Sequence, residues 1–312
     1  MKTLAAFAVS VLILAFLYAF IDTGALVAAL SSTNPLRLMG SLVLLLALVG
    51  LSAVRLKLLA EATDLHLRLS AATKATFAGD ALNLFLPGSM GDIAKATMLR
   101  APDGSVIPAV NLSIYEKVAD LFAIFAWGAM AAVVLDHGLE FSTIAVATVA
   151  GFLLLFILSS TPARILLRLK RKLAPKSLGL FDRLLDRWIV MVARVWLHPK
   201  VIVVVLCLSL VIWAGHFAQI GLMTWALGVE GPWIRLAAIL PVVILAGLAP
   251  LTVAGIGTRD AAIVLLVGPI IGFDKAAALG VLFWLRYIVP GLAGLPLMSA
   301  YFASVRNRTS IL

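Results

Sequence analysis

Charged residues are scarce in this sequence. Asp, Glu, Lys and Arg make up 13% of its 312 residues, whereas hydrophobic residues make up 63% and the mean hydropathy is +1.11. A soluble domain of this length has no core large enough to hide that much apolar surface. The composition therefore excludes a soluble globular protein and predicts an all-α integral membrane protein with several spans.

Cysteine and histidine are rarer still. The single cysteine, Cys207, excludes an intrachain disulfide and every two-cysteine redox motif. The four histidines are scattered along the chain, so no His-rich metal-binding cluster is present in the sequence. We therefore expect neither a metal nor another cofactor.

Long polar intervals are missing except at residues 160–200. An independent extramembrane domain needs about 50 residues or more of mixed composition, so residues 1–312 form one polytopic membrane domain. Ten Lys or Arg residues between 161 and 200 oppose only Asp182 and Asp186. A basic cluster beside membrane spans marks the cytoplasmic side and attracts anionic lipids, which favours a membrane surface over nucleic acid as the origin of the net charge of +10. Periodicity over residues 173–195 predicts an amphipathic helix at that interface.

Long apolar runs predict about six transmembrane helices. The first run resembles a signal peptide, but it exceeds the usual core of about 7–15 residues and no small-residue cleavage site follows, so we expect it to be retained. The predicted spans are residues 4–21, 36–54, 108–135, 141–159, 201–227 and 276–302.

One apolar segment, residues 76–100, is broken in its middle. Pro87 removes a backbone donor, and Gly88 and Gly91 loosen the chain. Each apolar half is shorter than the roughly 20 helical residues that a crossing needs. We predict a re-entrant hairpin from the cytoplasm, with a strained single crossing as the alternative. Such a break survives in a bilayer only where protein or a water-filled cavity surrounds it.

A second segment, residues 233–272, is interrupted in the same way around Pro250 and Gly257. With the basic interval on the cytoplasmic side, the two re-entrant broken-helix hairpins enter the bilayer from opposite faces. The sequence therefore predicts an inverted repeat, an organisation typical of secondary transporters, whose substrate site lies where the breaks meet.

Ionisable residues lie inside apolar sequence, where each charge costs about 2.5–3.5 kcal/mol at the bilayer centre unless it is paired or solvated. Glu116 and Asp120 share a helical face. Arg259 and Arg286, with Lys95, are suited to binding a phosphate. The alternative is that the charges form buried pairs that only hold helices together. The candidate substrate-binding residues are Asn83, Gly88, Asp92, Lys95, Glu116, Lys117, Asp120, Arg259, Asp260 and Arg286.

The order of these motifs resembles the lysylphosphatidylglycerol synthase transmembrane-region family, also called flippase-like domain proteins. Lys95 and Lys117 stand where many members have Arg, and Asp260 stands where Glu is usual, so charge is kept and reach is altered. In the best-known members a soluble aminoacyl-transferase domain follows this region. Because this chain ends at Leu312, the resemblance implies a stand-alone flippase-like protein of the bacterial inner membrane.

The expected function is movement of a phosphate-bearing lipid, such as a phospholipid, glycolipid or polyprenyl-linked lipid, between leaflets. An enzyme that uses Asp92, Glu116 and Asp120 as metal ligands is one alternative, for example a lipid phosphotransferase or phosphatase. A non-catalytic accessory protein of envelope-lipid synthesis is another. We expect no enzyme activity. The oligomeric state stays open, a homo-oligomer included.

Overall fold

The computed structural model describes residues 2–63, 65–86, 90–99, 106–134, 150–151, 153–159, 161–173, 179–231, 233–248, 252 and 255–298. These residues form helices joined by short turns and contain no strand. In chain order the elements are α1 (Lys2–Ala19), α2 (Thr23–Ser31), α3 (Pro35–Glu61), α4 (Leu69–Asn83), α5 (Gly91–Ala94), η1 (Lys95–Met98), α6 (Ile107–Val134), α8 (Thr161–Leu173), α9 (Leu180–Trp196), α10 (Pro199–Ala226), α11 (Trp233–Leu248), α12 (Thr258–Ile271), α13 (Phe273–Phe283), α14 (Leu285–Gly294) and η2 (Leu295–Leu297).

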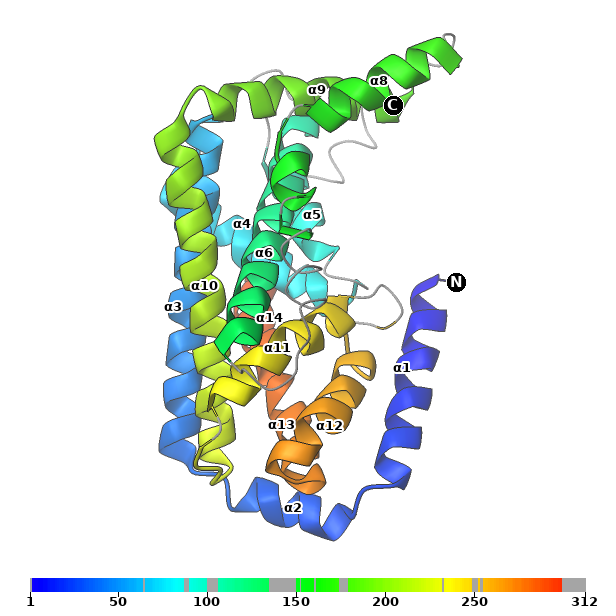
Figure 1. Ribbon diagram of the computed structural model, residues 1–312, viewed down its shortest axis with the longest axis vertical. Coiled ribbons are helices and arrows are strands. Elements are labelled where there is room, and N and C mark those ends of the chain that lie inside the picture. Colours follow the sequence, from blue (N-terminus) through cyan, green and yellow to red (C-terminus); the bar gives the residue numbers. More distant parts are fainter. Residues whose placement is uncertain are drawn as a thin grey trace.

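Two long helices, α3 and α10, run side by side in opposite directions along the whole molecule (Figure 1). They contain 27 and 28 residues, which gives each a length of about 40 Å at 1.5 Å per residue. The start of α3 is fixed by Asn34, whose side-chain oxygen accepts from the backbone N–H of Leu36 at 3.0 Å, and by Pro35 at the first helical position. The pair forms the frame against which the other helices pack.

The shorter helices pack in two matching pairs beside this frame. Helix α4 packs against α14, and α6 packs against α11. In Figure 1, α4 descends from the end of the molecule where α9 lies, whereas α11 rises from the opposite end where α2 lies. Helices α4 and α11 therefore both end between the two ends of the molecule (Figure 1).

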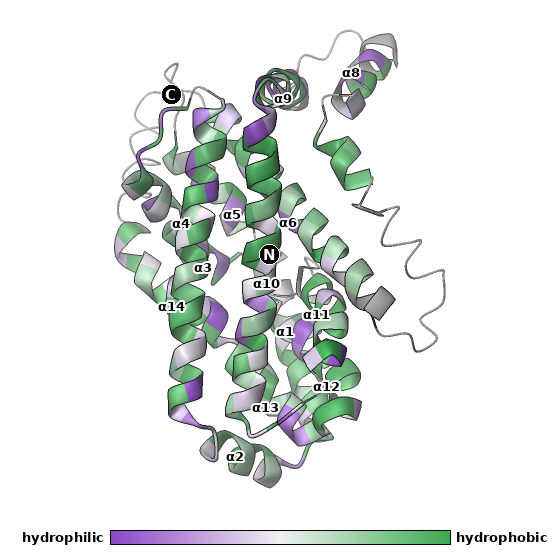
Figure 2. Cartoon of the chain, turned by 60° about the vertical axis from the view of Figure 1, so that its left-hand side comes forward, coloured by the Kyte–Doolittle hydropathy of each residue, from purple (hydrophilic) through white to green (hydrophobic). Residues whose placement is uncertain are grey.

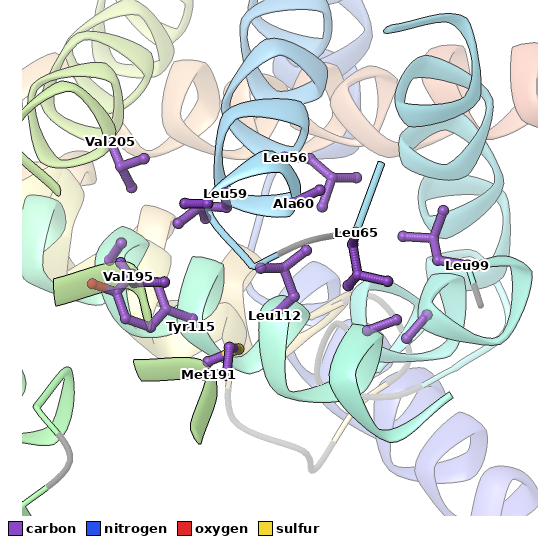
Figure 3. Close-up of a cluster of buried hydrophobic side chains, with 14 of the residues drawn as sticks. Leu56, Leu59, Ala60, Leu65, Leu99, Leu112, Tyr115, Met191, Val195 and Val205 are labelled. Atoms are coloured by element: carbon purple, nitrogen blue, oxygen red, sulfur yellow. The ribbon is translucent and has the colours of Figure 1, made fainter. Parts of the chain in front are cut away.

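Helices α8 and α9 lie across one end of the molecule, roughly perpendicular to α3 and α10 (Figure 1). The apolar face of α9 is buried, and its Met191 and Val195 meet Leu112 and Tyr115 of α6 (Figure 3). Burial of large apolar side chains contributes roughly 1.5–3 kcal/mol for each residue. The predicted amphipathic helix is thus present as α9, and residues 174–178 lie outside the described part of the chain.

Apolar side chains cover much of the outer surface as well as the core (Figure 2). Leu12, Phe16 and Leu36, for example, are at least 70% exposed, which in water would be a severe liability. Among the described residues, α3, α10 and the segment Phe273–Leu297 are long and apolar enough to cross a membrane. The bent pair of α1 and α2, with an angle of 97°, makes a fourth if it counts as one span. The protein is a multi-pass membrane protein.

The predicted spans agree well with three elements: α6, α10 and the segment Phe273–Leu297. The prediction for the second span was wrong at its end, because α3 continues past residue 54 to Glu61. No Pro or Gly interrupts residues 51–61, and Lys57 pairs with Glu61 at 2.9 Å one turn apart, which supports the extra turns. Of the predicted fourth span, residues 141–159, residues 141–149 and 152 lie outside the described part of the chain.

Candidate functional site

The first break is held together by Asn83, the last residue of α4. Its side-chain oxygen accepts from the backbone N–H of Gly91 at 2.8 Å, and its amide nitrogen donates to Asp92 at 3.1 Å. A side chain at Gly91 would collide with the backbone oxygen of Gly79 and the backbone nitrogen of Asn83. Only glycine therefore lets α5 approach α4 this closely. Gly88 of the predicted site lies outside the described residues.

Two ion pairs connect this break to α6. The Lys117 ammonium group lies 2.5 Å from an Asp92 carboxylate oxygen, and the Lys95 ammonium group lies 2.9 Å from Glu116. Lys95 and Glu116 are buried, whereas Lys117 and Asp92 are partly accessible. Since the two lysines reach two different carboxylates, α5 and η1 are fixed to α6 at two points.

Arg55 of α3 joins the same network. Its guanidinium group lies 2.6 Å from Asp120 and 3.7 Å from Glu116, and it donates to the hydroxyl of Ser209 on α10 at 2.8 Å. Asp120 also accepts from the indole N–H of Trp213 at 3.1 Å. Arg55 lies within α3 and is only 4% exposed.

These side chains line an internal cavity of about 160 Å³ enclosed by α3, α4, α6, α10, α11 and α14. This volume is large enough for several water molecules. Among the described residues, four cations and four carboxylates face the cavity: Arg55, Lys95, Lys117, Arg286, Asp80, Asp92, Glu116 and Asp120. The first break and α14 therefore contribute charges to one enclosed polar space.

Arg286 of α14 differs from the other cavity cations. It lies only 4.6 Å from the centroid of the Phe283 ring, measured from its guanidinium carbon, and is 9% exposed. Its Nε and Nη1 atoms have no hydrogen-bond partner, and no described carboxylate lies within ion-pair distance of it. A buried donor without a partner is costly. Among the described cavity cations, Arg286 is therefore the one without a carboxylate partner, and its unbonded donors are available to an anion.

Arg259 and Asp260 lie behind this wall and do not line the cavity. The Arg259 guanidinium carbon lies 4.6 Å from the ring centroid of Phe283 and 4.8 Å from that of Tyr287. These contacts are typical of cation–π packing. The structure thus brings Lys95 and Arg286 to one cavity and separates Arg259 from it by aromatic rings.

Asp260 holds the second break. One of its oxygens accepts from the backbone N–H of Gly257 at 2.8 Å, and the other accepts from the indole N–H of Trp284 at 3.0 Å. Gly257 has φ +101°, a conformation that favours glycine. The backbone donor at the N-terminus of α12 is thus occupied by the protein's own carboxylate.

Comparison with known protein families matches residues 3–294 to the Lysylphosphatidylglycerol synthase TM region. This chain belongs to that family. The match covers nearly the whole chain and includes both breaks and the cavity. A search of curated proteins finds no significant match.

In this family member, seven of the ten predicted substrate-binding residues line one cavity. The residues predicted and found there are Asn83, Asp92, Lys95, Glu116, Lys117, Asp120 and Arg286. Their binding of a substrate stays a prediction. The carboxylates of Asp92, Glu116 and Asp120 do not form a cluster that could hold a metal ion, because each lies against a cation.

Several polar cavity residues were not predicted from the sequence, among them Arg55, Asp80, Trp213 and His216. Asp80 carried a signal, because it follows Thr76 by four residues and precedes Asn83 by three, which places all three on one face of α4. All three line the cavity. Trp213 and His216 are also spaced for one face of α10, but nothing in the sequence relates that face to α6.

Proposed function

We propose that this protein moves a phosphate-bearing lipid between leaflets by passing its headgroup through the charged cavity. The observation that carries the proposal is Arg286, a buried guanidinium group without an anionic partner that lines an enclosed polar cavity. A guanidinium group binds phosphate with paired, charge-assisted hydrogen bonds. Intramembrane charges of this kind mark transport pathways more often than they serve stability.

The arrangement of the helices supports a transport function through an inverted repeat. If α3 is matched to α10, α4 to α11, and α6 to the α13–α14 segment, then the contact between α4 and α14 in one half corresponds to the contact between α11 and α6 in the other. Since α4 and α11 start from opposite ends of the bundle (Figure 1), the two halves have inverted orientations. Two such repeats that rock against each other give alternating access to a site between them.

The basic end of the molecule supports a cytoplasmic position for α8 and α9 in a bacterial inner membrane. On α8, the exposed side chains include Arg164 and Arg168 beside the apolar Ile165 and Leu169. This combination suits a helix that lies in the interface and contacts anionic headgroups. About six spans follow if α4–α5 and α11–α12 are re-entrant hairpins.

The test is lipid exchange between leaflets of proteoliposomes. The probe is a phosphatidylethanolamine or phosphatidylglycerol with a fluorophore on a short acyl chain, and albumin extracts it from the outer leaflet. Arg286→Gln is expected to slow exchange by about tenfold or more, because hydrogen bonds to a charged group contribute about 1.5–3 kcal/mol. Lys57→Gln removes an exposed cation of α3 and is the matched control.

Equal exchange by wild type and Arg286→Gln, with both proteins folded, would refute the site. The proposal assigns no chemical reaction to the chain, so mass spectrometry should recover the probe with its mass unchanged. Arg286→Lys keeps the charge and is expected to retain part of the activity, which separates loss of binding from misfolding.

A further inference from the structure

A second hollow adjoins the charged cavity on the side away from α9. It is a groove of about 850 Å³ between α6, α10 and α11, and its lining is almost entirely apolar, with Trp127, Phe217, Gly221, Trp225, Trp233 and Leu240 among its walls. This volume lies within the range of about 300–1,000 Å³ that pockets for small molecules occupy. The groove is therefore large enough for a ligand and is not a packing defect.

The groove and the charged cavity are neighbours along the same three helices. On α6, Ile124 lines the cavity and Trp127, less than one turn later, lines the groove. On α10, His216 lines the cavity and the next residue, Phe217, lines the groove. The two hollows thus adjoin each other within one helical turn on α6, and on α10 their linings overlap, because Ala214, which precedes His216, also lines the groove.

The third helix repeats this change. On α11, Ile244 lines the cavity, and Leu240, one turn before it, lines the groove. Because α11 runs from the α2 end towards the interior (Figure 1), the groove extends from the cavity towards the end opposite α9. Three helices that each line both hollows within one turn place the polar cavity and the apolar groove next to each other.

Polar atoms on the groove wall are already bonded within the protein. The Trp127 indole N–H donates to the carbonyl of Leu210 at 2.9 Å, and the Thr224 hydroxyl donates to the carbonyl of Ile220 at 2.9 Å. Glu230 lies at the exposed rim. The wall presents no unsatisfied donor or acceptor at these positions, so it suits a hydrocarbon and gives no reason to bind a polar ligand.

We infer that the groove binds the hydrocarbon tail of the same amphiphile whose phosphate binds at Arg286. This inference rests on the proposed function, since it assigns the headgroup to the charged cavity. The occupant is a lipid with its phosphate among the charges of α6 and α14 and its tail between α10 and α11, directed away from the basic end. A free phosphate would use the cavity and leave the groove empty.

The experiment is photolabelling of the purified protein in lipid nanodiscs. One probe is a phosphatidylethanolamine with a diazirine at the end of an acyl chain, and the other is a diacylglycerol with the same chains and no phosphate. Mass spectrometry maps the adducts. We expect the phospholipid probe to label the segment 218–240 about tenfold more than the diacylglycerol does, as one charge-assisted interaction with the headgroup would give.

Three variants sharpen the test. Arg286→Gln should remove the difference between the probes, because the headgroup loses its anchor. Ala218→Trp places a large ring on the groove wall and should abolish labelling there. Val211→Trp is the matched control, because Val211 lies on the same helix, is 54% exposed and lines neither hollow, so labelling of the groove should not change.

Equal labelling of the groove by both probes in the wild type would overturn the inference, because the groove would then be an ordinary lipid-contact surface. Unchanged labelling in Ala218→Trp would overturn it as well. If leaflet exchange fails while headgroup-dependent labelling persists, the transport proposal falls and the amphiphile site stands. If exchange depends on Arg286 while labelling ignores the headgroup, the tail site falls alone.

Discussion

Replacing Arg55 with Met should destabilise the protein severely, because Arg55 connects three helices through charges that have left water. Its guanidinium group contacts Asp120 at 2.6 Å, Glu116 at 3.7 Å and the hydroxyl of Ser209 at 2.8 Å. In Arg55→Met, Asp120 retains the indole N–H of Trp213 and Glu116 retains Lys95. Glu116 and Asp120, which lie one turn apart on α6, would then repel each other with one fewer cation beside them.

The magnitude follows from burial. Arg55 is 4% exposed, and removing one partner of a buried ion pair costs about 3–5 kcal/mol. Lys57, two residues along α3, pairs with Glu61 at 2.9 Å, but the side chains are 34% and 49% exposed. Removal of such a surface pair costs about 0–1 kcal/mol. Arg55→Met and Lys57→Met should therefore differ by several kcal/mol although both remove a cation from one helix.

The assay is unfolding in mixed micelles by titration with sodium dodecyl sulfate, followed by circular dichroism. The double variant Arg55→Met/Asp120→Asn removes the orphaned charge and should recover roughly 1–3 kcal/mol of the loss, a typical coupling energy for residues in contact. Equal losses for Arg55→Met and Lys57→Met would refute the reasoning. So would strict additivity in the double variant.

Two further predictions follow from the geometry. Gly91→Ala should lower the free energy of unfolding by about 1–3 kcal/mol, because the new methyl group overlaps the backbone of Gly79 and Asn83. Gly50→Ala, with no heavy atom within 4 Å of the new methyl group, should raise the free energy of unfolding by about 0.5–1 kcal/mol. The same titration measures both variants, and two losses of similar size would argue against the close approach of α5 to α4. For the topology, Ser31→Cys and Arg187→Cys in a Cys207→Ala background should react with a membrane-impermeant maleimide from opposite sides of the membrane, since α2 and α9 lie at opposite ends of the molecule; reaction of both from one side would contradict the proposed orientation.

The site residues at the first break and on α6 were easier to predict from sequence than those at the second break. Asn83, Asp92 and Lys95 follow a Pro-Gly break in an apolar run, and Glu116 and Asp120 share a helical face. Each of these signals is local, because it depends on residues within a few positions of each other. The cavity confirms that these side chains meet. These side chains pair with one another because an unpaired charge is costly in hydrocarbon.

The residues that follow the second break show where a prediction from neighbouring positions in the sequence fails. Arg259 and Asp260 follow a break that resembles the first, but three-dimensional packing turns Asp260 towards Trp284 and Arg259 towards Phe283. No local pattern distinguishes a cation that faces a cavity from one that packs under an aromatic ring. Arg55 illustrates the same limit, because its partners lie 61 and 65 positions away in the chain and belong to another helix.

The equal number of cations and carboxylates around the cavity bears on selectivity. With four of each, the wall charges sum to zero when all are ionised. A phosphate that enters alone adds uncompensated negative charge to a space of low dielectric constant, and its electrostatic cost rises accordingly. A headgroup that carries an amine beside its phosphate keeps the total at zero, because the amine can lie near a carboxylate such as Asp80 while the phosphate lies near Arg286. If the cavity binds a headgroup as proposed, the charge count of its described wall would favour zwitterionic headgroups over purely anionic ones.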